Sequence, residues 1–84
     1  MPELLPMKLQ LLAVILAEEE SFTAAAERLG TSPATVKAQI GELTTRLEFS
    51  LFREDGDAVE VTKDGEALID AFRQFLSQSG TLPE

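Results

Sequence analysis

Four segments of the chain place hydrophobic residues at the spacing of an α-helix. The first begins near Pro6, which suits the first turn of a helix because the nitrogen there needs no hydrogen bond. It runs through the apolar stretch "LQLLAVILA" to about Glu19. Its leucines recur every three or four residues, which predicts a buried stripe. They are Leu5, Leu9, Leu12 and Leu16.

Two further helices are predicted with only a tight turn between them. Ser21 suits the cap of a helix that runs through Arg28, and Gly30 is a natural stop. Ser32 then caps a third helix, with Pro33 at its first position and its end near residue 47. The apolar face of this helix consists of Val36, Ile40, Leu43 and Leu47. Together the two helices predict a helix-turn-helix over about residues 21–48.

The pattern changes from helical to alternating after the third helix. Val59 and Val61 alternate with Glu60, and the pair Asp55 and Gly56 has the chemistry of a hairpin turn. A two-stranded ribbon, or wing, is therefore predicted at about residues 50–61. It is unusually acidic: its carboxylates are Glu54, Asp55, Asp57 and Glu60.

A fourth helix is predicted over about residues 63–78. Thr62 can cap it, and Asp64 and Glu66 in its first turn complement the positive end of the helix dipole. Its wide apolar stripe consists of Ala67, Leu68, Ala71, Phe72, Phe75 and Leu76. Such a stripe most often packs within its own chain. Here it is wider than one three-helix core readily covers, which favours an additional interface.

The stretch "SFTAAAERLGTSPATVKAQIGELTTRLEFSLF", residues 21–52, resembles the DNA-binding domain of LysR-type transcriptional regulators, and "VEVTKDGEAL" continues the likeness. The resemblance covers about residues 7–76. It implies a mostly α fold, a winged helix-turn-helix with a two-stranded wing and a C-terminal dimerisation helix, forming a single domain over residues 1–84. It also implies transcriptional regulation by a homodimer. The interface residues expected on the last helix are Leu68, Ala71, Phe72, Phe75 and Leu76.

The exposed positions depart from the family pattern. Where the family presents serine and then arginine in the recognition helix, this chain has Lys37 and Ala38, and Gly41 and Glu42 stand where arginines commonly follow. In the hairpin, acids occupy positions where arginine is common. The side chains left to contact DNA are Ser32, Thr35, Lys37, Gln39, Arg46 and Arg53. A solvated surface charge is an equally good interpretation of Lys37 and Arg46.

The negative charge of the chain lowers the affinity expected for nucleic acid. Seven Lys and Arg against fifteen Asp and Glu give a net charge of −8, and residues 48–60 hold five acids and one base, Arg53. Since counterion release by Lys and Arg supplies much of DNA affinity, DNA binding is predicted to be weak. The alternative is a protein-interaction module with no direct DNA binding. It would pair with a relative, present the acidic wing to a basic surface, or dock a partner on the small residues Ala34, Ala38 and Gly41.

Several classes of function are disfavoured by composition. The chain has no cysteine and no histidine, which removes disulfides, thiolate nucleophiles and Cys/His zinc sites, and we predict no enzyme, no metal and no cofactor. The acidic turn lacks the twelve-residue spacing of a calcium loop. The apolar stretch of the first helix is shorter than the roughly 20 residues that span a bilayer, so no membrane partner is expected. The location expected is cytoplasmic. The 84 residues end where the family's proteins continue to a ligand-binding domain, so no effector sensing is inferred.

Overall fold

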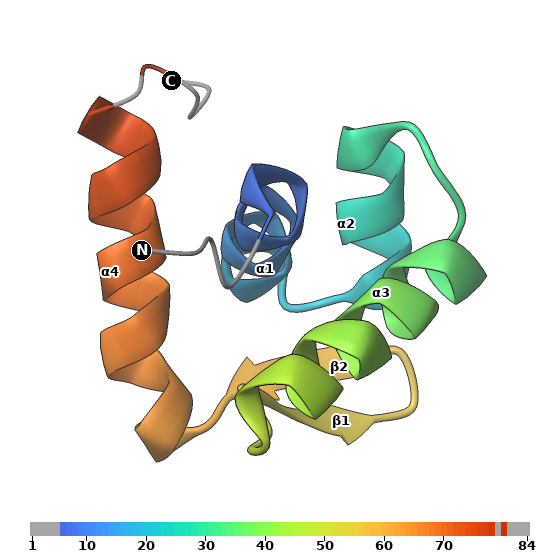
Figure 1. Ribbon diagram of the computed structural model, residues 1–84. Helices are drawn as coiled ribbons and strands as arrows, with labels where there is room; N and C mark the ends of the chain where they lie inside the picture. The colour runs from blue at the N-terminus through green and yellow to red at the C-terminus, as the bar shows by residue number, and fades with distance from the viewer. Residues whose placement is uncertain (1–5, 79, 81–84) are drawn as a thin grey trace.

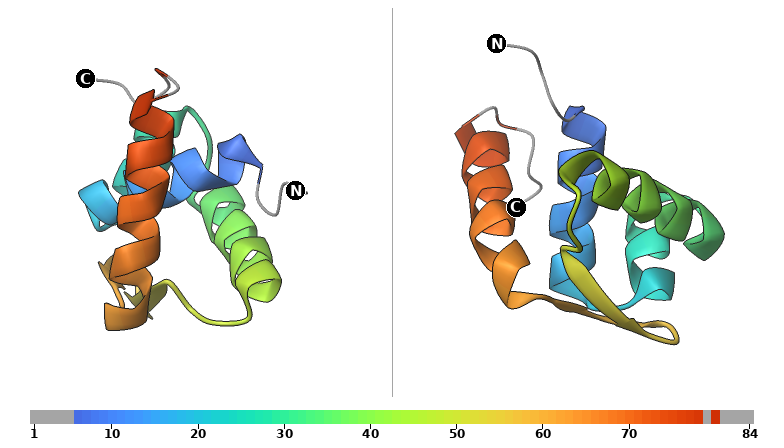
Figure 2. Two further views of the ribbon diagram at one scale, coloured as in Figure 1. Left: turned by 60° about the vertical axis from the view of Figure 1, so that its left-hand side comes forward. Right: turned by 60° about the horizontal axis from the view of Figure 1, so that its bottom comes forward.

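The computed structural model describes residues 6–78 and residue 80, and contains four helices and one hairpin within them. Helix α1 (Met7–Glu19) lies between α4 (Lys63–Gln78) on one side and the pair α2 (Phe22–Leu29) and α3 (Pro33–Leu47) on the other (Figure 1; Figure 2, right). Strands β1 (Phe52–Asp55) and β2 (Ala58–Val61) form the wing between α3 and α4. The predicted winged helix-turn-helix is confirmed.

Capping residues set the helix boundaries close to where the sequence predicts them. The Ser21 hydroxyl accepts a hydrogen bond from the Ala24 amide, and the Ser32 hydroxyl accepts one from the Thr35 amide. Gly30 ends α2 at φ 73°, a left-handed conformation that glycine adopts without a steric penalty. These local signals explain why the helix-turn-helix boundaries are predictable.

Helix α3 ends at a strained residue. Glu48 takes φ 67°, and its amide donates to the Thr44 carbonyl. A glycine would adopt this conformation freely, whereas a residue with a Cβ loses roughly 1–2 kcal/mol. Glu48 therefore ends α3 at some cost in stability.

The core is broader around α1 than a single stripe predicts. Leu9, Leu12 and Leu16 are buried as expected, and Leu5 lies outside the described residues. Ala13, Val14 and Ile15 are also buried, because α4 covers one side of α1 while α2 and α3 cover the other. The largest side chains that this core buries completely are those of Phe22, Ile15, Leu16, Leu43, Leu51, Leu76, Val14 and Val36.

The hairpin turn lies one residue later than predicted. Asp55 still belongs to β1, where it pairs with Ala58, so the two turn residues are Gly56 and Asp57. Gly56 has φ 63°, which suits the first position of a two-residue turn. The shift has a tertiary cause, since Asp57 is held in place by α2.

Helix α4 starts on a hydroxyl that joins it to the wing. The Thr62 hydroxyl accepts from the Gly65 amide at 3.0 Å and donates to the Ser50 carbonyl at 2.9 Å. Gly65 is buried directly against the backbone of Leu51. The predicted cap is thus confirmed, and it fixes the position where α4 leaves the wing.

Candidate nucleic-acid interface

The outward face of α3 carries most of the predicted DNA-contacting side chains. Ser32, Thr35, Lys37 and Arg46 are exposed, whereas Gln39 is half-buried. Thr35 and Gln39 line a groove of ≈ 250 Å³ whose walls come from α1, α2 and α3. The other lining residues are Lys8, Leu11, Leu12, Leu29 and Thr31. Gln39 thus belongs to this groove as well as to the edge of the α3 face.

The polar residues at the start of α3 are already engaged. The Ser32 hydroxyl accepts from the Thr35 amide at 3.2 Å and lies 2.9 Å from the Thr35 hydroxyl. These contacts close the first turn of α3. A base or phosphate contact by either hydroxyl would therefore share its hydrogen-bonding capacity with the cap.

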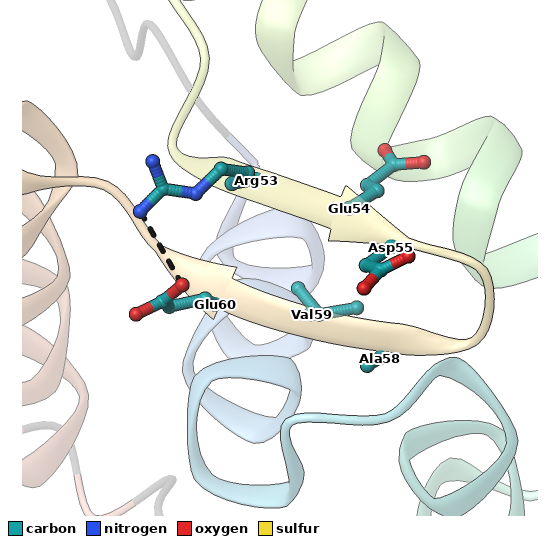
Figure 3. A pocket seen from close by; sticks show the side chains of 6 residues that line it. All are labelled: Arg53, Glu54, Asp55, Ala58, Val59 and Glu60. Carbon is teal, nitrogen blue, oxygen red and sulfur yellow. Dashed lines mark hydrogen bonds and ion pairs between the residues drawn. The ribbon is translucent and has the colours of Figure 1, made fainter.

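The basic candidates also have contacts inside the chain. The Lys37 ammonium lies 5.3 Å from the centre of the Phe22 ring, Arg46 pairs with Glu42 at 3.0 Å, and Arg53 pairs with Glu60 at 3.3 Å (Figure 3). Exposed ion pairs of this kind contribute about 0.2–1 kcal/mol. Such weak pairs can be exchanged for phosphate contacts, but each exchange reduces the gain on binding DNA.

Two other arginines form ion pairs that join neighbouring helices. Glu18 of α1 pairs with Arg28 of α2 at 2.7 Å and with Arg73 of α4 at 2.6 Å. Arg28 also pairs with Glu19 at 3.0 Å. Burial raises the pKa of Glu18, but the hydrogen bonds from Arg28 and Arg73 outweigh burial and bring that pKa below its ordinary value. Glu18 therefore remains ionised and connects both flanks of α1.

The acids of the wing point in different directions. Glu60 lies beside Arg53 on the outer face, while Glu54 points to the side on which α3 lies (Figure 3). A shallow hollow of ≈ 410 Å³ on the wing is lined by Arg53, Glu54, Asp55, Ala58, Val59 and Glu60. With three carboxylates against one guanidinium, this surface repels a phosphate rather than attracting it.

The sequence analysis counted Asp57 simply as one of the acids of the wing. In the structure its carboxylate is bound by the start of α2. Its carboxylate accepts hydrogen bonds from the Ser21 hydroxyl at 2.6 Å, the Thr23 amide at 3.0 Å and the Thr23 hydroxyl at 2.9 Å. Its backbone carbonyl accepts from the Phe22 amide at 3.0 Å. With Ser21 accepting from Ala24, the first three amides of α2 all have partners. Asp57 thus acts as a cap supplied by the wing.

The hydrogen bonds to Asp57 affect its ionisation. Those from Ser21 and then Thr23 hold the pKa of the Asp57 carboxyl below its ordinary value, and the charge of Lys37 acts in the same direction. The sequence analysis did not predict that Asp57 caps α2. Ser21 and Asp57 are 36 positions apart, and no local sequence motif contains both residues.

The residues expected at a dimer interface divide between core and surface. Phe72 and Leu76 are buried in the protomer, so their side chains are not available to a second copy. Leu68 is half-buried, Ala71 is exposed, and Phe75 has 46% of its surface exposed. Any contact between two α4 helices would therefore be made by Leu68, Ala71 and Phe75 rather than by all five residues.

The described part of the chain shows neither a cluster of acids suited to holding a metal ion nor a helix with the length and apolar character needed to cross a membrane. What it does present is an exposed helix, α3, entered through a tight turn and followed by a hairpin. The fold and this exposed helix define a winged helix-turn-helix domain. The family model for bacterial regulatory helix-turn-helix proteins of the lysR family matches residues 8–66, and the chain belongs to this family.

Known relatives agree with this assignment. A probable RuBisCO transcriptional regulator of Trieres chinensis is 35% identical over 75 residues, which are 87% of this chain and 24% of that protein. The chain thus spans about a quarter of the length of this curated relative. These matches are to regulators rather than to enzymes.

Solved structures show the same fold. The DNA-binding domain of CbnR in complex with DNA has a TM-score of 0.85 at 25% identity, covering 90% of this chain and 87% of that one. A full-length OxyR variant from Pseudomonas aeruginosa has a TM-score of 0.84 at 28% identity, covering 90% of this chain and 26% of that one.

Proposed function

We propose that this chain acts in transcriptional regulation and that it binds duplex DNA weakly, with α3 in the major groove. The observation that carries the proposal is the exposed α3 on a fold shared with a DNA-binding domain whose structure is a complex with DNA. Ser32, Thr35, Lys37, Gln39 and Arg46 lie on or beside this helix, and Arg53 lies on the wing. A cytoplasmic location is part of this proposal.

The weakness has a physical cause in the site. The cationic candidates each contact an acid or an aromatic ring of the same chain, and the wing hollow is lined mainly by carboxylates. DNA affinity falls with every phosphate that no Lys or Arg neutralises. The proposed interface therefore has the exposed helix that a DNA groove accepts, but few Lys and Arg side chains available to neutralise phosphates.

The experiment that tests the proposal is fluorescence anisotropy of a mixed-sequence duplex, titrated with the protein at several salt concentrations. Binding at low salt that declines steeply as salt rises supports the proposal, because counterion release gives this dependence. Absence of binding even at low salt contradicts it.

The second candidate function is a protein-interaction module on the same fold. It is favoured by the smallness of the outward face of α3, where Ala34, Ala38 and Gly41 are exposed and a Cβ added at Gly41 would meet no atom within 4 Å. Such a face lets a partner backbone approach closely. A flat anisotropy baseline at low salt would favour this function over DNA binding.

Reversing two wing charges is expected to strengthen DNA binding. The double variant Glu54→Arg and Glu60→Arg keeps Asp57 as the cap of α2 and should raise duplex affinity by about tenfold or more at low salt, with a steeper salt dependence. Anisotropy titrations measure both effects. The matched control is Asp70→Arg with Gln74→Arg and Gln78→Arg, which makes the same change in net charge at exposed positions of α4 beyond its first turn. Equal gains in both variants would show that the wing does not face DNA.

A homodimer formed through α4 is also proposed, because Phe75 is large, apolar and exposed beside Leu68 and Ala71. Phe75→Asp is expected to reduce the mass measured by light scattering from that of two chains to that of one, since a carboxylate would have to be buried at the interface. Gln74→Asp is the control, as it adds the same charge at the neighbouring exposed position. A parent mass of one chain, or an unchanged mass for Phe75→Asp, contradicts the interface.

A further inference from the structure

The tip of the wing, residues 55–58, is attached to the domain differently from the base of the wing. At the base, Leu51, Phe52 and Val59 are buried in the core. Every residue of the tip is exposed. Because a two-stranded hairpin is marginally stable without apolar packing, the tip needs another attachment to stay in one position.

The side chain of Asp57 makes that attachment. The Ser21 hydroxyl donates to one carboxylate oxygen at 2.6 Å, and the amide and hydroxyl of Thr23 donate to the other at 3.0 and 2.9 Å. We call these three hydrogen bonds the tip contact. Hydrogen bonds accepted by an ionised carboxylate are stronger than neutral ones. The tip contact therefore holds the wing tip against the start of α2.

Two backbone hydrogen bonds lie beside the tip contact. The Phe22 amide donates to the Asp57 carbonyl at 3.0 Å, and the Val59 amide donates to the Glu20 carbonyl at 3.1 Å. Both join the hairpin to the start of α2, so both require the wing tip to stay against that helix. The exchange rates of these two amide hydrogens with solvent therefore report whether the tip is attached.

The wing held in this way carries acids on the side proposed to meet DNA. Glu54 points to the side on which α3 lies (Figure 3), and it lines the wing hollow together with Asp55 and Glu60. A carboxylate repels a phosphate more strongly the closer it is held, within a Debye length of about 10 Å at moderate salt. A fixed wing cannot move these carboxylates away from a duplex bound by α3, whereas a wing with a free tip can.

We propose that Asp57 is a positioning residue that limits DNA affinity: through the tip contact it keeps the acidic wing beside α3, and opening the contact lets the wing move away from the phosphates. This inference rests on the proposed function and adds to it an element of the fold that sets the affinity. Ser21 and Thr23 carry no charge, so the contact can be opened without altering the net charge of the chain.

The first test needs no DNA. The double variant Ser21→Ala and Thr23→Val removes both hydroxyls that bind the Asp57 carboxylate. Hydrogen exchange followed by NMR should show the Phe22 and Val59 amides exchanging about tenfold faster or more, with the Thr62 amide at the base of the hairpin unchanged. Unchanged rates at Phe22 and Val59, or an equal acceleration at Thr62, would overturn the inference.

The second test measures duplex affinity by fluorescence anisotropy at low salt. The double variant is expected to bind a mixed-sequence duplex about two- to fivefold more tightly than the parent, since its wing can move away from the phosphates. Thr23→Ser keeps the hydroxyl and is the matched control, with the affinity of the parent. Thr23→Val alone replaces the double variant if the latter does not fold, and a smaller gain is expected. An affinity equal to or below that of the parent contradicts the positioning role.

The third test reverses the sign of the effect. In the Glu54→Arg and Glu60→Arg background the wing attracts phosphates, and an attracting group that is already fixed loses less freedom on binding. The same two hydroxyl substitutions should then lower duplex affinity by about two- to fivefold. A gain in both backgrounds would show that the effect does not depend on the charge of the wing, and the inference would fail.

These measurements also separate the inference from the proposed function. If the parent binds duplex with a steep salt dependence but opening the tip contact leaves the affinity unchanged, the proposed function stands and the positioning role of Asp57 fails. If no variant binds duplex even at low salt, the proposed function fails, and the positioning role fails with it.

Discussion

Phe22→Ala is expected to lower the free energy of unfolding by about 3–5 kcal/mol. Phe22 is completely buried at the first position of α2, and its amide is bound by the wing, so the substitution leaves a cavity between the helix-turn-helix and the hairpin. A domain of this size has a total stability of only about 4–13 kcal/mol. Urea unfolding followed by circular dichroism measures the change, and Phe22→Leu provides a milder version if the alanine variant does not fold.

The control for this prediction is another phenylalanine. Phe49 lies between α3 and the wing with 36% of its surface exposed, so Phe49→Ala should cost less than about 1 kcal/mol. Similar losses for the two alanine variants would mean that Phe22 contributes no more to the stability of the core than a partly exposed phenylalanine does.

The second large effect is a change in the free energy of unfolding when alanine replaces glycine at Gly65 of α4, compared with the same substitution at Gly41 of α3. At Gly65, a Cβ would lie 2.6 Å from the Leu51 carbonyl oxygen and 3.0 Å from the Leu51 Cα. These are backbone atoms that cannot rotate away, so Gly65→Ala should destabilise by about 1–3 kcal/mol or more as α4 is pushed from the wing. At Gly41 the added Cβ meets nothing within 4 Å, so Gly41→Ala should stabilise by up to about 1 kcal/mol.

Urea unfolding of both glycine variants against the parent tests this pair. The two variants are expected to change the free energy of unfolding in opposite directions, because the added Cβ meets the Leu51 backbone at Gly65 and no atom at Gly41. A Gly65→Ala variant as stable as the parent would show that α4 can leave Leu51 without loss. The Gly41→Ala variant also serves in the anisotropy assay, where it tests how closely DNA approaches α3.

Local chemistry explains which parts of the fold were predictable. Ser21 and Ser32 cap helices through amides three positions later, and Gly30 ends a helix by its own conformation, so each signal is contained in a few consecutive residues. Hydrophobic periodicity located the helices for the same reason. It did not reveal that α1 is buried on two sides, since Ala13, Val14 and Ile15 interrupt a single stripe and become core only when helices cover both flanks.

The candidate site was less predictable because its contacts are long-range. The residues of α3 were placed correctly on an outward face, but nothing near Asp57 in the sequence indicates that Ser21 and Thr23 will bind its carboxylate. The apolar stripe of α4 had a similar ambiguity. Periodicity identifies an apolar face without saying which part of it the protomer covers, and here Phe72 is covered while Phe75 is not.

The contact between Ser21 and Ala58 has a consequence for association between molecules. An antiparallel bridge joins these residues, so β2 has β1 on one edge, and the start of α2 covers the Ala58 end of the other. Within the described residues no further strand pairs with the outer edge of β1, whose residues after Phe52 are Arg53, Glu54 and Asp55. Consecutive charges on an open edge discourage a strand of another molecule from adding to the sheet.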